Sequence, residues 1–155
     1  MTGDDLRQQV AIEFEAIAKV VEELTALQNE LDAQGREPTV REKTAAGAFL
    51  AEFYNGIENI LKRISISNNL PLPSGETWHI ELFQRFCLPK QQPLPVLFDD
   101  ELASEIASFR KFRHVFFHGY GFYMDWDRMQ YGVTAVASVL EKFKSKLDEY
   151  LAGLA

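Results

Sequence analysis

The spacing of apolar residues predicts helices along most of the chain. Between Asp4 and about Ala33, apolar residues recur at the three- and four-residue intervals of an amphipathic helix. The same periodicity returns over 39–65, 99–118 and 127–150, and more briefly over 76–87. We find no alternating pattern long enough for a strand. These intervals predict an all-α protein with four long helices and one additional short helix, packed as an up-and-down four-helix bundle.

Turn and capping residues mark the expected helix ends. Residues 34–38 contain a glycine and a proline, which favour a helix end and disfavour its continuation. Thr39 followed by Glu42 predicts a capping box at the start of the second helix. Asp127 with Gln130 predicts a similar cap for the last helix.

The charge balance limits the partners that the surface can bind. The 155 residues suit one helical domain over 1–155, and 16 Lys and Arg against 23 Asp and Glu leave a net charge of -7. This acidity excludes sequence-blind coating of nucleic acid by a broad basic surface. Any contact with nucleic acid must therefore be local.

Cysteine use and hydropathy indicate the expected compartment. Cys87 is the single cysteine, so an internal disulfide or a cysteine-based zinc site is excluded within one chain. No apolar run approaches the length of about 18 residues typical of a membrane span. We expect a cytoplasmic protein with neither a signal peptide nor a membrane segment.

One short segment reverses the overall acidity and carries the candidate chemistry. Residues 110–118 contain three basic residues, no acidic residue and two of the three histidines. Arg113 offers a planar set of donors for a phosphate. His118 lies where Gly119 and Gly121 are expected to end the helix, and a helix C-terminus favours a protonated imidazole.

Arginine, histidine and a nearby tyrosine hydroxyl form a minimal set for metal-free RNA cleavage. The ribose 2′-OH would attack the adjacent phosphate, His118 would move a proton, and Arg113 would stabilise the phosphorane. The two residues are five positions apart, which places them about 140° apart around a regular helix. The helix must therefore bend or end close to them.

The segment from Arg113 to Tyr120 resembles a known signature. It reads Arg-His-Val-Phe-Phe-His-Gly-Tyr, which is similar to the Arg-x4-His-x-Tyr motif of the HEPN superfamily and of its HepT-like ribonuclease toxins in particular. The helical organisation, the length and the position of the motif on the penultimate long helix extend the resemblance over roughly residues 5–150. His114 occupies a position where the family usually has asparagine or another small polar residue.

The resemblance implies an activity, partners and residue roles. It implies a metal-independent endoribonuclease without a cofactor, in which a homodimer brings two motifs together around an RNA substrate. Arg113 and His118 would be catalytic, and the two copies of His118 would act as acid and base. The partner would be a minimal nucleotidyltransferase (MNT-type) antitoxin, which in some systems adenylylates the motif tyrosine, here Tyr120.

Polar residues on the second predicted helix are supporting candidates. Members of the family often place a polar or acidic side chain there that reaches the motif, and Asn55 and Glu58 occupy suitable positions. A carboxylate from Glu58 would orient Arg113. From the helical pattern alone, a solvent-exposed position for this side chain is the favoured interpretation.

Two interpretations of the histidines as metal ligands have less support than the metal-independent ribonuclease. His114 and His118 have the i, i+4 spacing of paired metal ligands, but no spacing identifies a third ligand. Glu76 and His79 form only half of a di-iron motif, so His79 is expected on the helix surface or partly buried. We predict no metal ligands.

A catalytically silent interaction module is the main alternative function. It would use the same helical bundle to dimerise or to bind an antitoxin, and it would tolerate loss of His118. Aromatic residues within and just after the motif could cap the end of the bundle, stack on RNA bases or build a dimer interface. The interface is the favoured interpretation and base stacking is the second; the residues are Phe117, Tyr120, Phe122, Tyr123 and Trp126.

Overall fold

The computed structural model describes residues 2–120 and 123–154, and within them the regular structure is helical. Gly121 and Phe122, which enter the sequence predictions, lie outside the described residues. The helices are α1 (Gly3–Gln34), α2 (Val40–Ser67), α3 (Trp78–Gln84), α4 (Asp100–Phe117) and α5 (Trp126–Ala152). The predicted all-α fold of four long helices and one short helix is confirmed.

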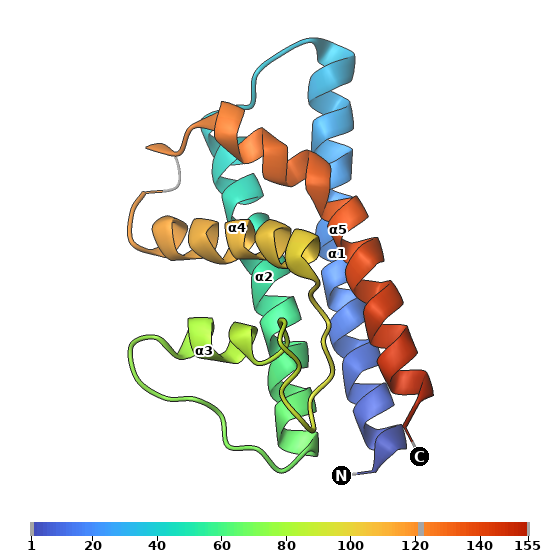
Figure 1. Ribbon diagram of the computed structural model, residues 1–155. Helices are drawn as coiled ribbons and strands as arrows, with labels where there is room; N and C mark the ends of the chain where they lie inside the picture. The colour runs from blue at the N-terminus through green and yellow to red at the C-terminus, as the bar shows by residue number, and fades with distance from the viewer. Residues whose placement is uncertain (1, 121–122, 155) are drawn as a thin grey trace.

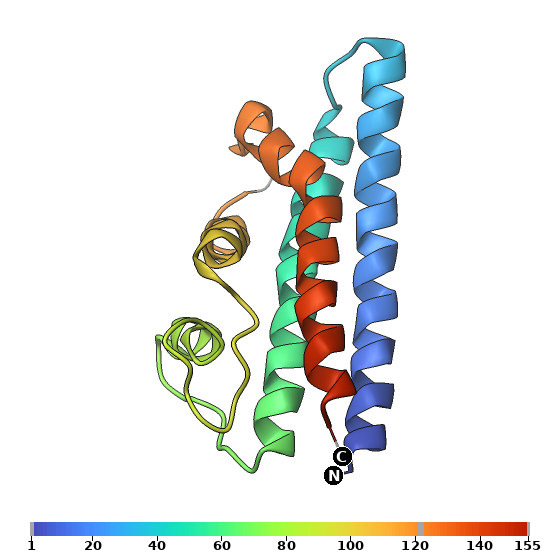
Figure 2. The same cartoon turned by 45° about the vertical axis from the view of Figure 1, so that its right-hand side comes forward.

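Helix α2 is the centre of the molecule. It packs against each of the other four helices. Helices α1, α2 and α5 run along a common direction, whereas α4 lies across α2 with α3 beside it on the same face (Figures 1 and 2). This arrangement brings the expected motif helix, α4, against the middle of α2.

Burial on α2 follows from this central position. Its buried residues extend beyond a single stripe, because neighbouring helices cover several of its sides. The fully buried large side chains include Phe53, Tyr54, Ile57, Ile60 and Leu61. The buried set also contains one carboxylate, Glu58.

The turn between α1 and α2 forms as predicted. Gly35 ends α1 in the left-handed conformation at φ 58°, which glycine adopts without steric cost. Thr39 and Glu42 form the predicted capping box at the start of α2. Hydrogen bonds from Arg36 lower the pKa of Glu42 to about 2, so this carboxylate is charged at neutral pH.

The predicted cap of the last helix is wrong by two residues. Helix α5 begins at Trp126, and the Asp125 side chain accepts a hydrogen bond from the backbone N–H of Asp127. Trp126 is only 8% exposed, because it packs into the core from the first position of the helix. Helix α3 is also shorter than the predicted 76–87.

Gly56 allows close packing between α1 and α2. A Cβ atom at this position would overlap the Ile17 side chain. We expect Gly56→Ala to lower the free energy of unfolding by about 1–3 kcal/mol, because overpacking outweighs the gain in helix propensity. Urea denaturation measures this effect, with Gly153→Ala as a control whose Cβ meets only backbone oxygens at 3.5 Å or more. Stability at or above wild type would contradict the close approach.

None of the described helices combines the length and apolar character that crossing a membrane requires.

Candidate functional site

The motif lies on the last two turns of α4 and just beyond them. The Asp99 side chain caps the start of the helix by accepting from the backbone N–H of Leu102 at 2.8 Å. Leu102, Ile106 and Phe109 are the buried residues of α4. The helix ends at Phe117, and His118 follows as the C-terminal cap residue. The helix therefore ends within the motif, as the sequence predicts.

Arg113 is half-buried and turns toward the other helices. Its Nε–H donates a hydrogen bond to Oδ1 of Asn55 on α2. Its Nη1 lies 3.5 Å from Nε2 of His79 on α3. The guanidinium carbon also lies 5.1 Å from the centre of the Phe117 ring. The side chain is thus held between α2, α3 and its own helix.

Glu58 occupies a different environment from the expected one. The favoured interpretation of a solvent-exposed position is wrong, since the residue is 3% exposed. Its Oε2 lies 2.6 Å from Nδ1 of His79. Glu58 therefore reaches Arg113 through His79 and not by direct contact. The reason is the packing of α3 against this part of α2.

His79 is the site residue that the sequence does not identify. Its side chain is partly buried, as expected, but its two ring nitrogens connect a carboxylate on α2 with the guanidinium on α4. No periodicity relates position 79 to position 113, because they lie on different helices. The adjacent Trp78, whose ring centre lies 3.6 Å from that of His79, is the one local signal of a packed histidine.

Two further titratable groups lie in or near this buried region. Burial raises the pKa of Tyr54, and the charge of Glu58 raises it further. The Tyr54 hydroxyl has no hydrogen-bond partner among the described residues. Burial also raises the pKa of Cys87 to about 11, so its thiol is protonated at neutral pH. Neither group is poised to act as a nucleophile at neutral pH.

His118 is exposed and has a fixed ring orientation. Its Nδ1 lies 2.7 Å from the backbone oxygen of His114, which only accepts, so Nδ1 carries the hydrogen of this bond. In the neutral ring, Nε2 then holds the lone pair. The rings of His114 and His118 lie 4.2 Å apart. His114 thus contacts His118 through both its carbonyl group and its ring.

The structure does not bring all predicted residues together. Arg113 contacts Asn55 and His79, while within the described part of the chain no hydrogen bond joins it to His118. Tyr120 is 70% exposed, and its ring meets that of Tyr123 edge to face at 6.0 Å. A single chain therefore presents an arginine network and, apart from it, an exposed histidine and tyrosine.

The expected aromatic surface is smaller than predicted. Phe117 and Tyr123 are exposed by 58% and 78%, in agreement with an accessible surface at the end of α4. Trp126 is buried, so its assignment to that surface is wrong. Phe122 lies outside the described residues.

Across residues 2–120 and 123–154, no three or more His, Cys, Asp and Glu side chains lie together as metal ligands. The pair formed by His114 and His118 thus has no third ligand among these residues.

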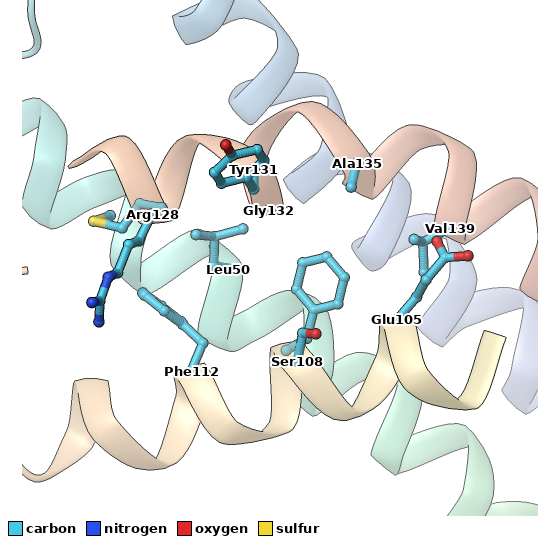
Figure 3. A pocket seen from close by; sticks show the side chains of 11 residues that line it. Leu50, Glu105, Ser108, Phe112, Arg128, Tyr131, Gly132, Ala135 and Val139 are labelled. Carbon is cyan, nitrogen blue, oxygen red and sulfur yellow. The ribbon is translucent and has the colours of Figure 1, made fainter. Parts of the chain in front are cut away.

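A cleft of about 360 Å³ lies between α4 and α5, away from the arginine network (Figure 3). Phe112 and Leu50 lie toward one end of it, and Glu105 and Val139 lie toward the other. The lining includes neither Arg113 nor His118. The predicted site and this cleft are therefore separate features of α4.

One of three comparisons with known proteins identifies a family for this chain. A family model described as HepT-like protein matches residues 45–154, which include nearly all of α2, the whole of α3 to α5 and the complete motif segment. The match begins after α1, so it is shorter than the expected resemblance over residues 5–150. Searches of curated proteins and of solved structures found no match. The chain belongs to the HepT-like family.

Proposed function

We propose that this protein is a metal-independent endoribonuclease of a HEPN and nucleotidyltransferase toxin–antitoxin module. The observation that carries the proposal is the fixed guanidinium of Arg113 on α4, the helix that His118 caps. Asn55 on α2 and His79 on α3 hold this guanidinium in place. A guanidinium with a fixed orientation is suited to a phosphate, and an exposed imidazole is suited to proton transfer. Membership of the HepT-like family supports the same activity.

The proposed reaction needs a base, an acid and a cation. The ribose 2′-OH attacks the adjacent phosphorus while Nε2 of one His118 accepts its proton. A protonated His118 from the second protomer donates a proton to the departing 5′-oxygen, so a 2′,3′-cyclic phosphate and a 5′-hydroxyl form. Arg113 stabilises the charge on the phosphorane.

Dimerisation is part of the proposal. The exposed aromatic rings at the end of α4 provide apolar area for a symmetric contact. A homodimer joined there would place two copies of the basic segment 110–118 beside one another, which concentrates positive charge on an acidic protein.

A negative charge in this aromatic surface is expected to weaken the dimer. We expect Tyr123→Glu to shift the mass measured by light scattering toward the monomer, because a two-fold interface brings the two new charges together. Ile12→Glu, at an exposed position on α1, is the matched control. A Tyr123→Glu protein that remains dimeric at the concentration where wild type is dimeric would contradict the placement of the interface.

Membership of the HepT-like family supports a proposed partner and a proposed modification. We propose that a minimal nucleotidyltransferase antitoxin transfers AMP from ATP to the hydroxyl oxygen of Tyr120, a residue that is 70% exposed, and releases pyrophosphate. Mass spectrometry of the protein after incubation with such an enzyme and ATP tests this, with Tyr120→Phe as the control that lacks the acceptor oxygen. The expected cytoplasmic location stays a prediction.

The activity is tested by incubating RNA with purified protein in excess EDTA. We expect cleavage by wild type and by Lys111→Ala, which removes an exposed positive charge from the same helix. We expect none by a variant with both Arg113 and His118 changed to alanine. Absence of cleavage by folded, dimeric and antitoxin-free wild type would overturn the proposal and favour the interaction module.

A further inference from the structure

The short helix α3 connects a buried carboxylate with the motif arginine. The residue that makes the connection is His79, near the start of this helix. Its Nδ1 lies 2.6 Å from Oε2 of Glu58, and its Nε2 lies 3.5 Å from Nη1 of Arg113. The two contacts lie on opposite sides of one imidazole ring. His79 therefore stands between a group that accepts and a group that only donates.

This order of groups determines the protonation of His79. An ionised Glu58 only accepts, so Nδ1 of His79 carries the hydrogen between them. The guanidinium of Arg113 only donates, so Nε2 must hold a lone pair. The neutral imidazole with its hydrogen on Nδ1 satisfies both neighbours. A hydrogen on Nε2 would point at the N–H groups of Arg113.

The contacts also fix the plane of the guanidinium. Asn55 accepts from Nε and His79 accepts from Nη1, so two sites of one rigid, planar group are held by different helices. Nη2 of Arg113 has no hydrogen-bond partner among the described residues. Its N–H groups therefore remain for a phosphate.

The ring of His79 is itself held in place. Trp78 packs against it, with ring centres 3.6 Å apart, and Nζ of Lys62 on α2 lies 4.6 Å from the centre of the Trp78 ring. These contacts attach the start of α3 to α2. A ring that is packed in this way holds its hydrogen-bonding directions, as a positioning group must.

We propose that His79 is a positioning residue for Arg113, acting as a neutral imidazole that accepts from Nη1 and donates from Nδ1 to the buried carboxylate of Glu58. The inference rests on the proposed ribonuclease function, because it assigns His79 the task of aligning the phosphate-binding group. It also makes a statement about protonation that holds without RNA.

The first test uses the wild-type chain without RNA. The chain has three histidines, so a sample labelled with 15N-histidine contains three ring systems, which His114→Ala and His118→Ala assign. The 15N shifts distinguish a protonated ring nitrogen from a bare one. We expect His79 to be neutral at pH 7 with its hydrogen on Nδ1. An imidazolium, or a hydrogen on Nε2, would overturn the proposal.

The second test separates positioning from structural support. In His79→Gln the amide can present its oxygen near the former Nε2 and still accept from Arg113. In His79→Asn the shorter amide can bond Glu58 but does not reach the guanidinium. We expect His79→Asn to lower kcat about 10- to 100-fold with little change in KM, and His79→Gln to restore most of the loss. Ile80→Ala, at an exposed position on α3, is the matched control.

The outcomes distinguish this inference from the proposed function. Equal losses in both variants, in proportion to their thermal stability, would mean that His79 only supports the fold. Wild-type kcat in both would also overturn the positioning role while the nuclease stands. Absence of cleavage by wild type, together with the expected Nδ1–H form, would overturn the nuclease and leave the hydrogen-bonded arrangement intact.

Discussion

Changing His118 to alanine is expected to lower the rate of RNA cleavage by about 10²- to 10⁴-fold, the usual contribution of a positioned general acid or base. In a symmetric dimer the change removes both proposed proton-transfer groups at once. The measurement is kcat on a short RNA in the presence of EDTA. Because the side chain is exposed and lies at the end of α4, the variant is expected to retain its thermal stability.

His114→Ala is the matched control for that variant. The His118 ring is oriented by the backbone oxygen of His114, and an alanine keeps this oxygen. Only the contact between the two rings, 4.2 Å apart, is lost. We therefore expect a change of only a few-fold. Equal losses for His114→Ala and His118→Ala would mean that the pair acts through packing, and a few-fold loss for both would contradict proton transfer by His118.

The helical periodicity of the sequence predicts most of the helices of the fold. Apolar spacing and caps such as Thr39 with Glu42 depend on neighbours within four residues, so the sequence predicts them directly. The cap of α5 was misplaced because burial of Trp126 outweighs the local preference for Asp127 as a cap. The course of α4 across α2 depends on packing between distant helices, which no local spacing reports.

The residues of the candidate site also divide into those that the sequence predicts and those that depend on packing between helices. Arg113, His118 and Tyr120 lie within eight consecutive residues, so a motif can identify them. Asn55 is accessible to sequence reasoning only through the family resemblance. Glu58 is buried and hydrogen-bonded to His79 because α3 packs on α2. No local spacing pattern predicts this contact, because the two residues lie on different helices, 21 positions apart.

Replacing Arg113 with lysine is expected to lower kcat by about 10²- to 10³-fold, as loss of a fixed donor to a developing oxyanion does in other enzymes. Lysine keeps the positive charge, so the variant separates charge from geometry. A lysine side chain lacks the Nε–H group from which Asn55 accepts a hydrogen bond. Its ammonium group is also not planar, so it cannot face Asn55 and His79 at once in the fixed orientation of the guanidinium.

Lys111→Ala provides the opposite case, because it removes a charge from an exposed position on the same helix and leaves the guanidinium network intact. Its expected effect is a few-fold rise in KM that disappears at high salt, since exposed charges act at long range and are screened. If Arg113→Lys instead retained kcat within a few-fold and Lys111→Ala lost it, the basic segment would act by its net charge. The orientation of Arg113 by α2 and α3 would then have no part in the reaction.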